Sequence, residues 1–173
     1  ELLENNARGI LLDFYEAFGG QMPFTGRDRL AEATILAQEL RIFHDFFAEG
    51  RLEDTVEVET GHPRLGAAVI RHGHDLLILL RMEGYEEDFF IDEAYMGRTE
   101  ISVRIEGAPP MHAWRMDFPG ARPLEIMRDA VGAMRFLAGP LELTGLILLT
   151  PGTHRCQELA QVLHSVLPRV AKA

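Results

Sequence analysis

Acidic residues lie on and just past a short apolar run near the start of the chain. The run occupies residues 10–15, lies between Gly9 and Gly19, carries Asp13, and is followed directly by Glu16. An apolar run of this kind is typical of a buried parallel strand, and barrel folds place catalytic groups at the carboxyl ends of such strands. Asp13 and Glu16 are therefore candidates for substrate-contacting carboxylates. The alternative, which we favour, is that nearby amides hold them as cap or loop carboxylates.

A complete catalytic site is not evident in this sequence. Acid hydrolysis of a sugar bond needs two carboxyl groups about 5 to 10 Å apart, and only one convincing strand carries a candidate. The chain has no glycine-rich phosphate loop, no Gly-x-Ser-x-Gly motif and no Cys–His pairing that suggests a nucleophile. We therefore leave the catalytic residues unknown, and expect no nucleophilic catalysis by this chain alone.

Two histidines and an aspartate occur close together at His72, His74 and Asp75. This spacing allows a zinc or iron site, with His62 or His112 as a further ligand. The same residues, with a glycine between the histidines and apolar runs on both sides, are typical of a tight hairpin turn. We favour the turn, and predict neither a metal nor a cofactor.

Acidic and aromatic residues mark a third region. Carboxylates at residues 86–88 and 92–93 bracket the apolar run 89–91 and could supply oxygen ligands to calcium, but no calcium-loop motif is present, so we favour a solvated loop. Tyr85, Tyr95 and Trp114 could form a stacking platform for sugars. Packing in a core or an interface is the alternative that we favour for these rings.

The composition restricts the partners. The formal net charge is −10 and the arginines are scattered, so no basic stripe is available for nucleic acid. No apolar run approaches the about 20 residues of a membrane span, so we expect a soluble protein. Cys156 is the single cysteine, which excludes an internal disulfide and leaves a cytoplasmic or secreted location equally open.

Helices are predicted on both sides of a region rich in short apolar runs. Residues 28–49 carry apolar side chains at helical spacing, with a start resembling a capping box at Thr25 and Asp28. Gly50 is suited to a left-handed residue at the end of that helix. A closing helix is predicted over residues 153–171, with Cys156, Leu159, Val162, Leu163, Val166, Leu167 and Val170 on one face.

The region between the helices predicts antiparallel strands. Spacings of eight to twelve residues between turns favour a sandwich or a barrel. The predicted strands are 55–59, 65–71, 76–82, 89–91, 99–105, 111–118, 124–128, 134–137 and 141–150. Residues 76–80 and 146–149 are apolar at every position, so both faces of these strands must be covered. The two helices can provide that cover, as can a domain outside this chain.

Three segments together resemble the C-terminal third of a glycoside-hydrolase-like protein, in which a (β/α)₈ barrel precedes an antiparallel β-sandwich. They are residues 7–18, residues 36–50 and a β-domain ending in residues 143–150. The resemblance implies an α+β chain with a terminal βα unit in residues 1–52 and a sandwich with a C-terminal helix in residues 53–173. It implies that Asp13, Tyr15 and Glu16 lie near the substrate opening.

The same resemblance implies partners, because one strand cannot form a barrel. We expect a barrel portion that precedes Glu1, which is not a methionine, or else a second chain. A carbohydrate is the expected ligand, and the family's two catalytic carboxylates usually lie on earlier strands. Two alternatives stay open: a stand-alone β-sandwich module for glycan binding or protein assembly, and a structural role with the apolar strands in a homo-oligomer interface.

Overall fold

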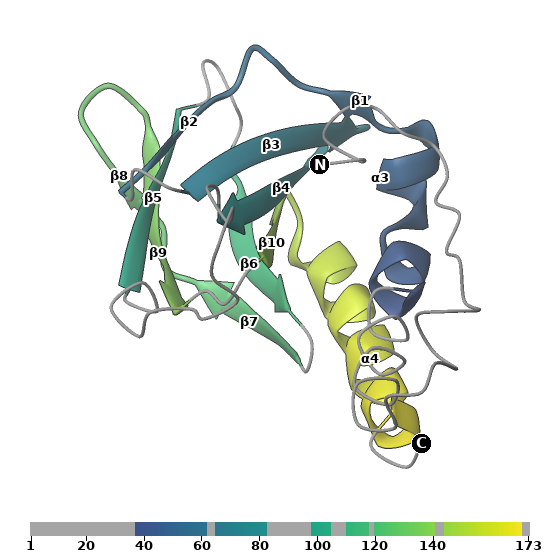
Figure 1. Ribbon diagram of the computed structural model, residues 1–173. Coiled ribbons are helices and arrows are strands. Elements are labelled where there is room, and N and C mark those ends of the chain that lie inside the picture. The colour runs from purple at the N-terminus through teal and green to yellow at the C-terminus, as the bar shows by residue number, and fades with distance from the viewer. Residues whose placement is uncertain are drawn as a thin grey trace, which may run out of the picture.

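The computed structural model describes residues 37–61, 65–82, 98–104, 110–117, 120–140 and 144–170. Residues 37–42 are helical, and after a turn at Phe43 the helix α3 spans His44–Glu49. The strands are β1 (Arg51–Leu52), β2 (Glu57–Thr60), β3 (Leu65–His72), β4 (Asp75–Met82), β5 (Arg98–Arg104), β6 (His112–Asp117), β7 (Gly120–Leu124), β8 (Met127–Arg128), β9 (Met134–Pro140) and β10 (Thr144–Thr150), and α4 is Thr153–Val170. Figure 1 shows their arrangement.

The strands form two antiparallel sheets. One has six strands in the order β1-β3-β4-β10-β6-β7, and the other has four in the order β2-β5-β9-β8. Each strand pairing in both sheets is antiparallel. The prediction of a mixed α+β chain, mostly antiparallel and ending in a helix, is confirmed. The predicted strand at residues 10–15, the start of the first helix and the strand at 89–91 lie outside the described residues.

The strands β4 and β10 lie side by side and are buried on both faces, as their sequences predict. Leu76 pairs with Leu149 and Ile78 with Ile147, and both pairs belong to a hydrophobic cluster shared with the four-stranded sheet. The alternate residues, with Leu77 among them, belong to a second cluster shared with the helices. Because side chains alternate across a strand, an uninterrupted apolar run supplies both clusters.

The helices supply the cover on one face of the six-stranded sheet (Figure 1). Phe43 and Phe46 before and within α3 are each 1% exposed, and Leu163 of α4 is fully buried in the same cluster. An ion pair joins the two helices, with Arg155 Nη2 2.9 Å from Asp45 Oδ2. The chain around residues 37–49 is thus packed directly onto the β-sheet.

Two details of the helices differ from the predictions. Gly50 ends the helix but has φ −65° and ψ 164°, so the left-handed conformation is wrong. A glycine is needed there for space, because a Cβ would lie 2.2 Å from the Phe46 carbonyl oxygen and 2.6 Å from Ile70 Cγ2. Val162 is 44% exposed, because it lies at the flank of the stripe formed by Cys156, Leu159 and Leu163.

The predicted strand 124–128 is wrong, because the chain changes sheets there. β7 ends at Leu124 and pairs with β6, whereas β8 begins at Met127 and pairs with β9 of the other sheet. Leu124 and Ile126 both pack against the cluster between the sheets, so the residues that cross over are apolar like a strand. β1 lies before residue 53, the predicted start of the β-domain, and pairs with β3. Within the described ranges, no helix is long and apolar enough to span a membrane.

Candidate functional site

The sequence-predicted candidates Asp13, Tyr15 and Glu16 lie outside the residues that the structure describes. The same holds for the acidic residues at 86–88 and 92–93, and for Tyr85 and Tyr95. These assignments stay predictions. The described candidates lie on the two sheets, on α3 and α4, and on the connections among them.

The His72–Asp75 segment forms the hairpin turn that the sequence favours. His72 pairs with Asp75 across a two-residue loop, and Gly73 has φ +60°, as such turns require. The His72 ring lies edge-on to Phe46, with centroids 5.7 Å apart, and its Nε2 is 3.6 Å from Glu49 Oε2. His72 therefore contacts α3, while His74 is exposed at the turn. Among the described residues, no group of three His, Cys, Asp or Glu side chains could hold a metal.

Trp114 lies on β6 and is half-buried. Its ring packs against the hydrophobic cluster between the six-stranded sheet and the helices. This is the packing role that we favoured for the ring. Neither of the two tyrosines of the proposed stacking platform is described, so Trp114 alone defines no sugar-binding surface.

Cys156 is fully buried in α4. Burial, and then the negative charge of Asp75, raise the pKa of its thiol to about 12. A thiolate is the reactive form of cysteine, so this side chain stays protonated and unreactive near neutral pH. Its role is to fill space between α4 and the sheet.

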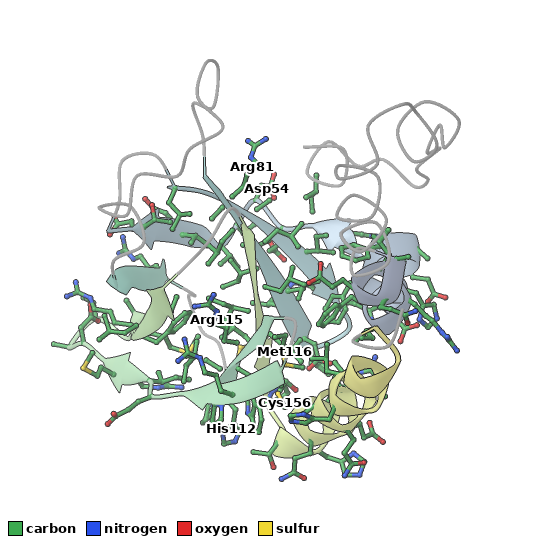
Figure 2. The ribbon with its side chains drawn as sticks, turned by 60° about the horizontal axis from the view of Figure 1, so that its bottom comes forward. Asp54, Arg81, His112, Arg115, Met116 and Cys156 are labelled. Atoms are coloured by element: carbon green, nitrogen blue, oxygen red, sulfur yellow. The ribbon has the colours of Figure 1, made fainter. Side chains whose placement is uncertain are left out.

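Two arginines bind the same backbone oxygen. They lie on β6 and β7, at the edge of the six-stranded sheet that is farthest from β1. Arg115 Nη1 and Arg122 Nη2, from paired positions on β6 and β7, each lie 2.8 Å from the carbonyl oxygen of Ala138. Ala138 occupies a bulge in β9, where the register shifts, and Gly139 follows with φ +82°. The bulge turns this oxygen from its own sheet toward the arginines of the other. These two hydrogen bonds connect the six-stranded sheet to the four-stranded sheet, and Figure 2 shows Arg115 between them.

A groove opens where the chain passes from the six-stranded sheet to the four-stranded sheet. Its volume is about 300 Å³, and its lining comes from the connection after β1, from β2 and from the middle of β3. The lining residues are Leu52, Glu53, Asp54, Val56, Val58, Ala67, Ala68 and Val69. The walls are therefore mostly apolar, with two carboxylates at one side.

Glu53 is held firmly at that side of the groove. Its carboxylate accepts hydrogen bonds from the hydroxyl of Thr55 and from Arg71 Nε, and the Thr55 amide lies 3.1 Å from Oε1. The Thr55 hydroxyl first, and then the Arg71 guanidinium, lower the pKa of Glu53 below its usual value of 4.5. Glu53 is thus an ionised structural residue. The adjacent Asp54 is exposed, and Figure 2 labels it.

Sequence reasoning did not identify this groove. The groove exists because β1 stops pairing with β3 after Leu52. The residue types at positions 51–56 do not indicate where that pairing ends. The signal in the sequence is the run of small residues Gly66, Ala67 and Ala68 in the first half of β3.

The geometry thus consists of a helix-covered sheet, a second sheet and a small groove at their common edge. Comparison of the amino-acid sequence with protein families and with curated proteins finds no family model and no protein that matches it.

Proposed function

We propose that this chain is the C-terminal part of a carbohydrate-active, glycoside-hydrolase-like protein, in which a β-sandwich braces the segment before it and the catalytic pair lies elsewhere. One observation supports the bracing role above all. The helical residues 37–49 belong to the helix of the predicted βα unit, and they are buried against the six-stranded sheet through Phe43 and Phe46. The described end of the predicted βα unit therefore packs on the six-stranded sheet.

The bracing contact has the properties of a permanent interface. The cluster between sheet and helices contains aromatic and aliphatic side chains that are nearly or fully buried, including Leu77 and Leu148. Interfaces of this apolar kind form within domains and obligate assemblies rather than between transient partners. The Asp45–Arg155 ion pair adds orientation at the edge of the cluster.

The carbohydrate part of the proposal rests on the resemblance in residues 7–18, 36–50 and 143–150. Its test compares the polypeptide purified from its source with the isolated 173-residue chain, using a panel of aryl glycosides. We expect hydrolysis by the source polypeptide and none by the isolated chain. Hydrolysis by the isolated chain would show that it carries a complete catalytic pair, and inactivity of both would remove the glycosidase assignment.

A second candidate function is a non-catalytic β-sandwich module for protein assembly. The groove beside β3 favours it, because an apolar recess at a sheet edge is a common place for a partner segment to bind. Size measurement of the source protein separates the two candidates. A source polypeptide of 19.5 kDa that is stable alone supports the module, whereas a much longer polypeptide or a tightly bound second chain supports the brace.

A further inference from the structure

We propose that the edge of β3 at Ala67, together with the groove beside it, binds an extended segment of another polypeptide by strand addition. The segment carries a small apolar side chain that enters the groove and a neighbouring lysine or arginine that meets the acidic rim. This proposal does not depend on the carbohydrate assignment, because it rests on β1, β2, the β3–β4 hairpin and the described residues that connect them.

The backbone of Ala67 faces the open edge. In the β3–β4 hairpin, His72 pairs with Asp75 across a two-residue turn, so residues 72, 70, 68 and 66 hydrogen-bond to β4 and the alternate residues point away. Val69 confirms this alternation, because its carbonyl oxygen accepts from the Glu53 amide of the departing β1 at 2.9 Å. By the same alternation, the N–H and C=O of Ala67 point toward the side from which β1 has departed.

The edge is open for one pairing position. β1 pairs with β3 only at Arg71 and Ile70, and after Glu53 the chain crosses toward β2 (Figure 1). At the other end, the Thr60 hydroxyl donates to the carbonyl oxygen of Leu65 at 2.8 Å. Within the described ranges, no strand lies beside Ala67 on that side. A peptide strand placed there would exchange two hydrogen bonds with Ala67.

The groove selects the side chain opposite Ala67. Cross-strand partners place their side chains on the same face of a sheet, so this side chain would project into the groove against Val56 and Val58. Ala67 is exposed in the middle of its strand, whereas Leu65 and Val69 on the same face are buried. The missing bulk at position 67 gives room for a valine-sized side chain from a partner.

The negative charge at the rim of the groove favours a different polypeptide, and not a second copy of this chain, as the occupant. Asp54 is exposed beside the groove, the charge of the adjacent Glu53 is paired with Arg71, and the chain has a net charge of −10. Two copies would bring like charges together at this edge, which is unfavourable. A basic side chain adjacent to the apolar one is instead attracted to Asp54, so the predicted occupant is a different, basic segment.

The experiment uses a fluorescein-labelled seven-residue peptide of alternating valine and lysine, titrated into the 173-residue chain by anisotropy. The matched probes carry N-methyl groups either on the valines or on the lysines. Because the residue opposite Ala67 must donate its N–H, we expect valine N-methylation to weaken binding at least about tenfold and lysine N-methylation to have little effect. Equal binding of both methylated peptides, or no saturable binding of the parent peptide, would overturn the proposal.

Substitutions in the protein test the same contacts that the methylated peptides test. Ala67→Pro removes an N–H that β4 does not use, so the variant should fold and bind the peptide at least about tenfold more weakly. Asp54→Asn should weaken binding and reduce its salt dependence, whereas Glu125→Gln, at an exposed acid of another region, should not. If Ala67→Pro fails to fold, the methylated peptides still decide the question. A dimer of the unliganded chain that Asp54→Asn strengthens would identify a second copy as the occupant and contradict the proposal.

Discussion

Arg155 Nη2 of α4 lies 2.9 Å from Asp45 Oδ2 of α3, and so joins the helix that closes the chain to the helix that precedes the sheets. Both side chains are about one-third exposed, at 36% and 30%. Asp45 is also 2.6 Å from His44 Nε2. The ion pair therefore lies at the solvent edge of a contact whose main stabilisation comes from the apolar residues beneath it.

The strength of this pair can be measured with a double-mutant cycle of Asp45→Ala and Arg155→Ala. We expect a coupling free energy of about 0.5 kcal/mol that decreases with salt, because water screens a partly exposed pair. The matched cycle is His154 with Glu158, which lie 3.5 Å apart but are 84% and 53% exposed, and its coupling should be near zero. Equal coupling in both cycles would show that the pair does not orient the helices.

The apolar contact should dominate the attachment of α3. Phe46→Ala removes a ring that is 1% exposed and leaves a cavity, so it should lower the free energy of unfolding by about 3 to 5 kcal/mol. Phe47→Ala is the matched control, because Phe47 is only half-buried at the margin of the same cluster, and should cost about 1 kcal/mol. Urea denaturation measures both values. Similar costs for the two variants would contradict the assignment of Phe46 to the centre of the contact.

Gly50 provides a test of close packing between α3 and β3. Gly50→Ala would place a Cβ against the Phe46 carbonyl oxygen and Ile70, so we expect a loss of about 1 to 3 kcal/mol in stability. Gly152→Ala is the control, because a Cβ there meets no atom within 4 Å, and should change stability by less than about 0.5 kcal/mol. Thermal unfolding followed by circular dichroism compares them. A stable Gly50→Ala variant would show that the helix end is looser than described.

The raised pKa of the Cys156 thiol predicts that the folded chain loses stability at alkaline pH. Burial and the nearby Asp75 raise the thiol pKa from 9.0 to about 12 in the folded chain. Above pH 9 the unfolded chain loses this proton while the folded chain keeps it, so the folded state binds more protons and stability falls as pH rises toward 12.

The control for this pH effect is Cys156→Ala, in which the thiol component of the pH dependence should disappear. Denaturation at several pH values between about 8 and 11 compares the two proteins. Iodoacetamide should label native Cys156 much more slowly than the unfolded chain, because the thiol is buried and protonated. Rapid labelling of the native protein would contradict this environment.

The sequence predicted the elements well where burial leaves a periodic pattern. The uninterrupted apolar runs in β4 and β10 predicted cover on both faces, and the clusters around Leu76 and Leu77 confirm it. The hairpin at Gly73 was evident from local turn chemistry. These features depend on residues that are close in sequence, which is why a pattern reveals them.

Other features depend on which segments meet in space, and no pattern revealed them. The change of sheets between Leu124 and Met127 looks like a continuous strand, because the crossing residues are apolar. Gly50 looks like an ordinary helix terminus, although the proximity of Ile70 is what requires it. The open edge at Ala67 follows only from where β1 ends. The predicted carboxylates Asp13 and Glu16 stay predictions outside the described ranges.

The measurement that tests the proposed bracing role most directly is the heat inactivation of the aryl-glycoside hydrolysis that we propose for the source polypeptide. Phe46→Ala and Phe47→Ala are compared with the unaltered protein. If the β-domain braces the catalytic part, hydrolysis by Phe46→Ala should be lost several degrees below that of the other two proteins. Hydrolysis that persists in Phe46→Ala after the β-domain has unfolded would show that the catalytic part needs no brace, and would contradict the account.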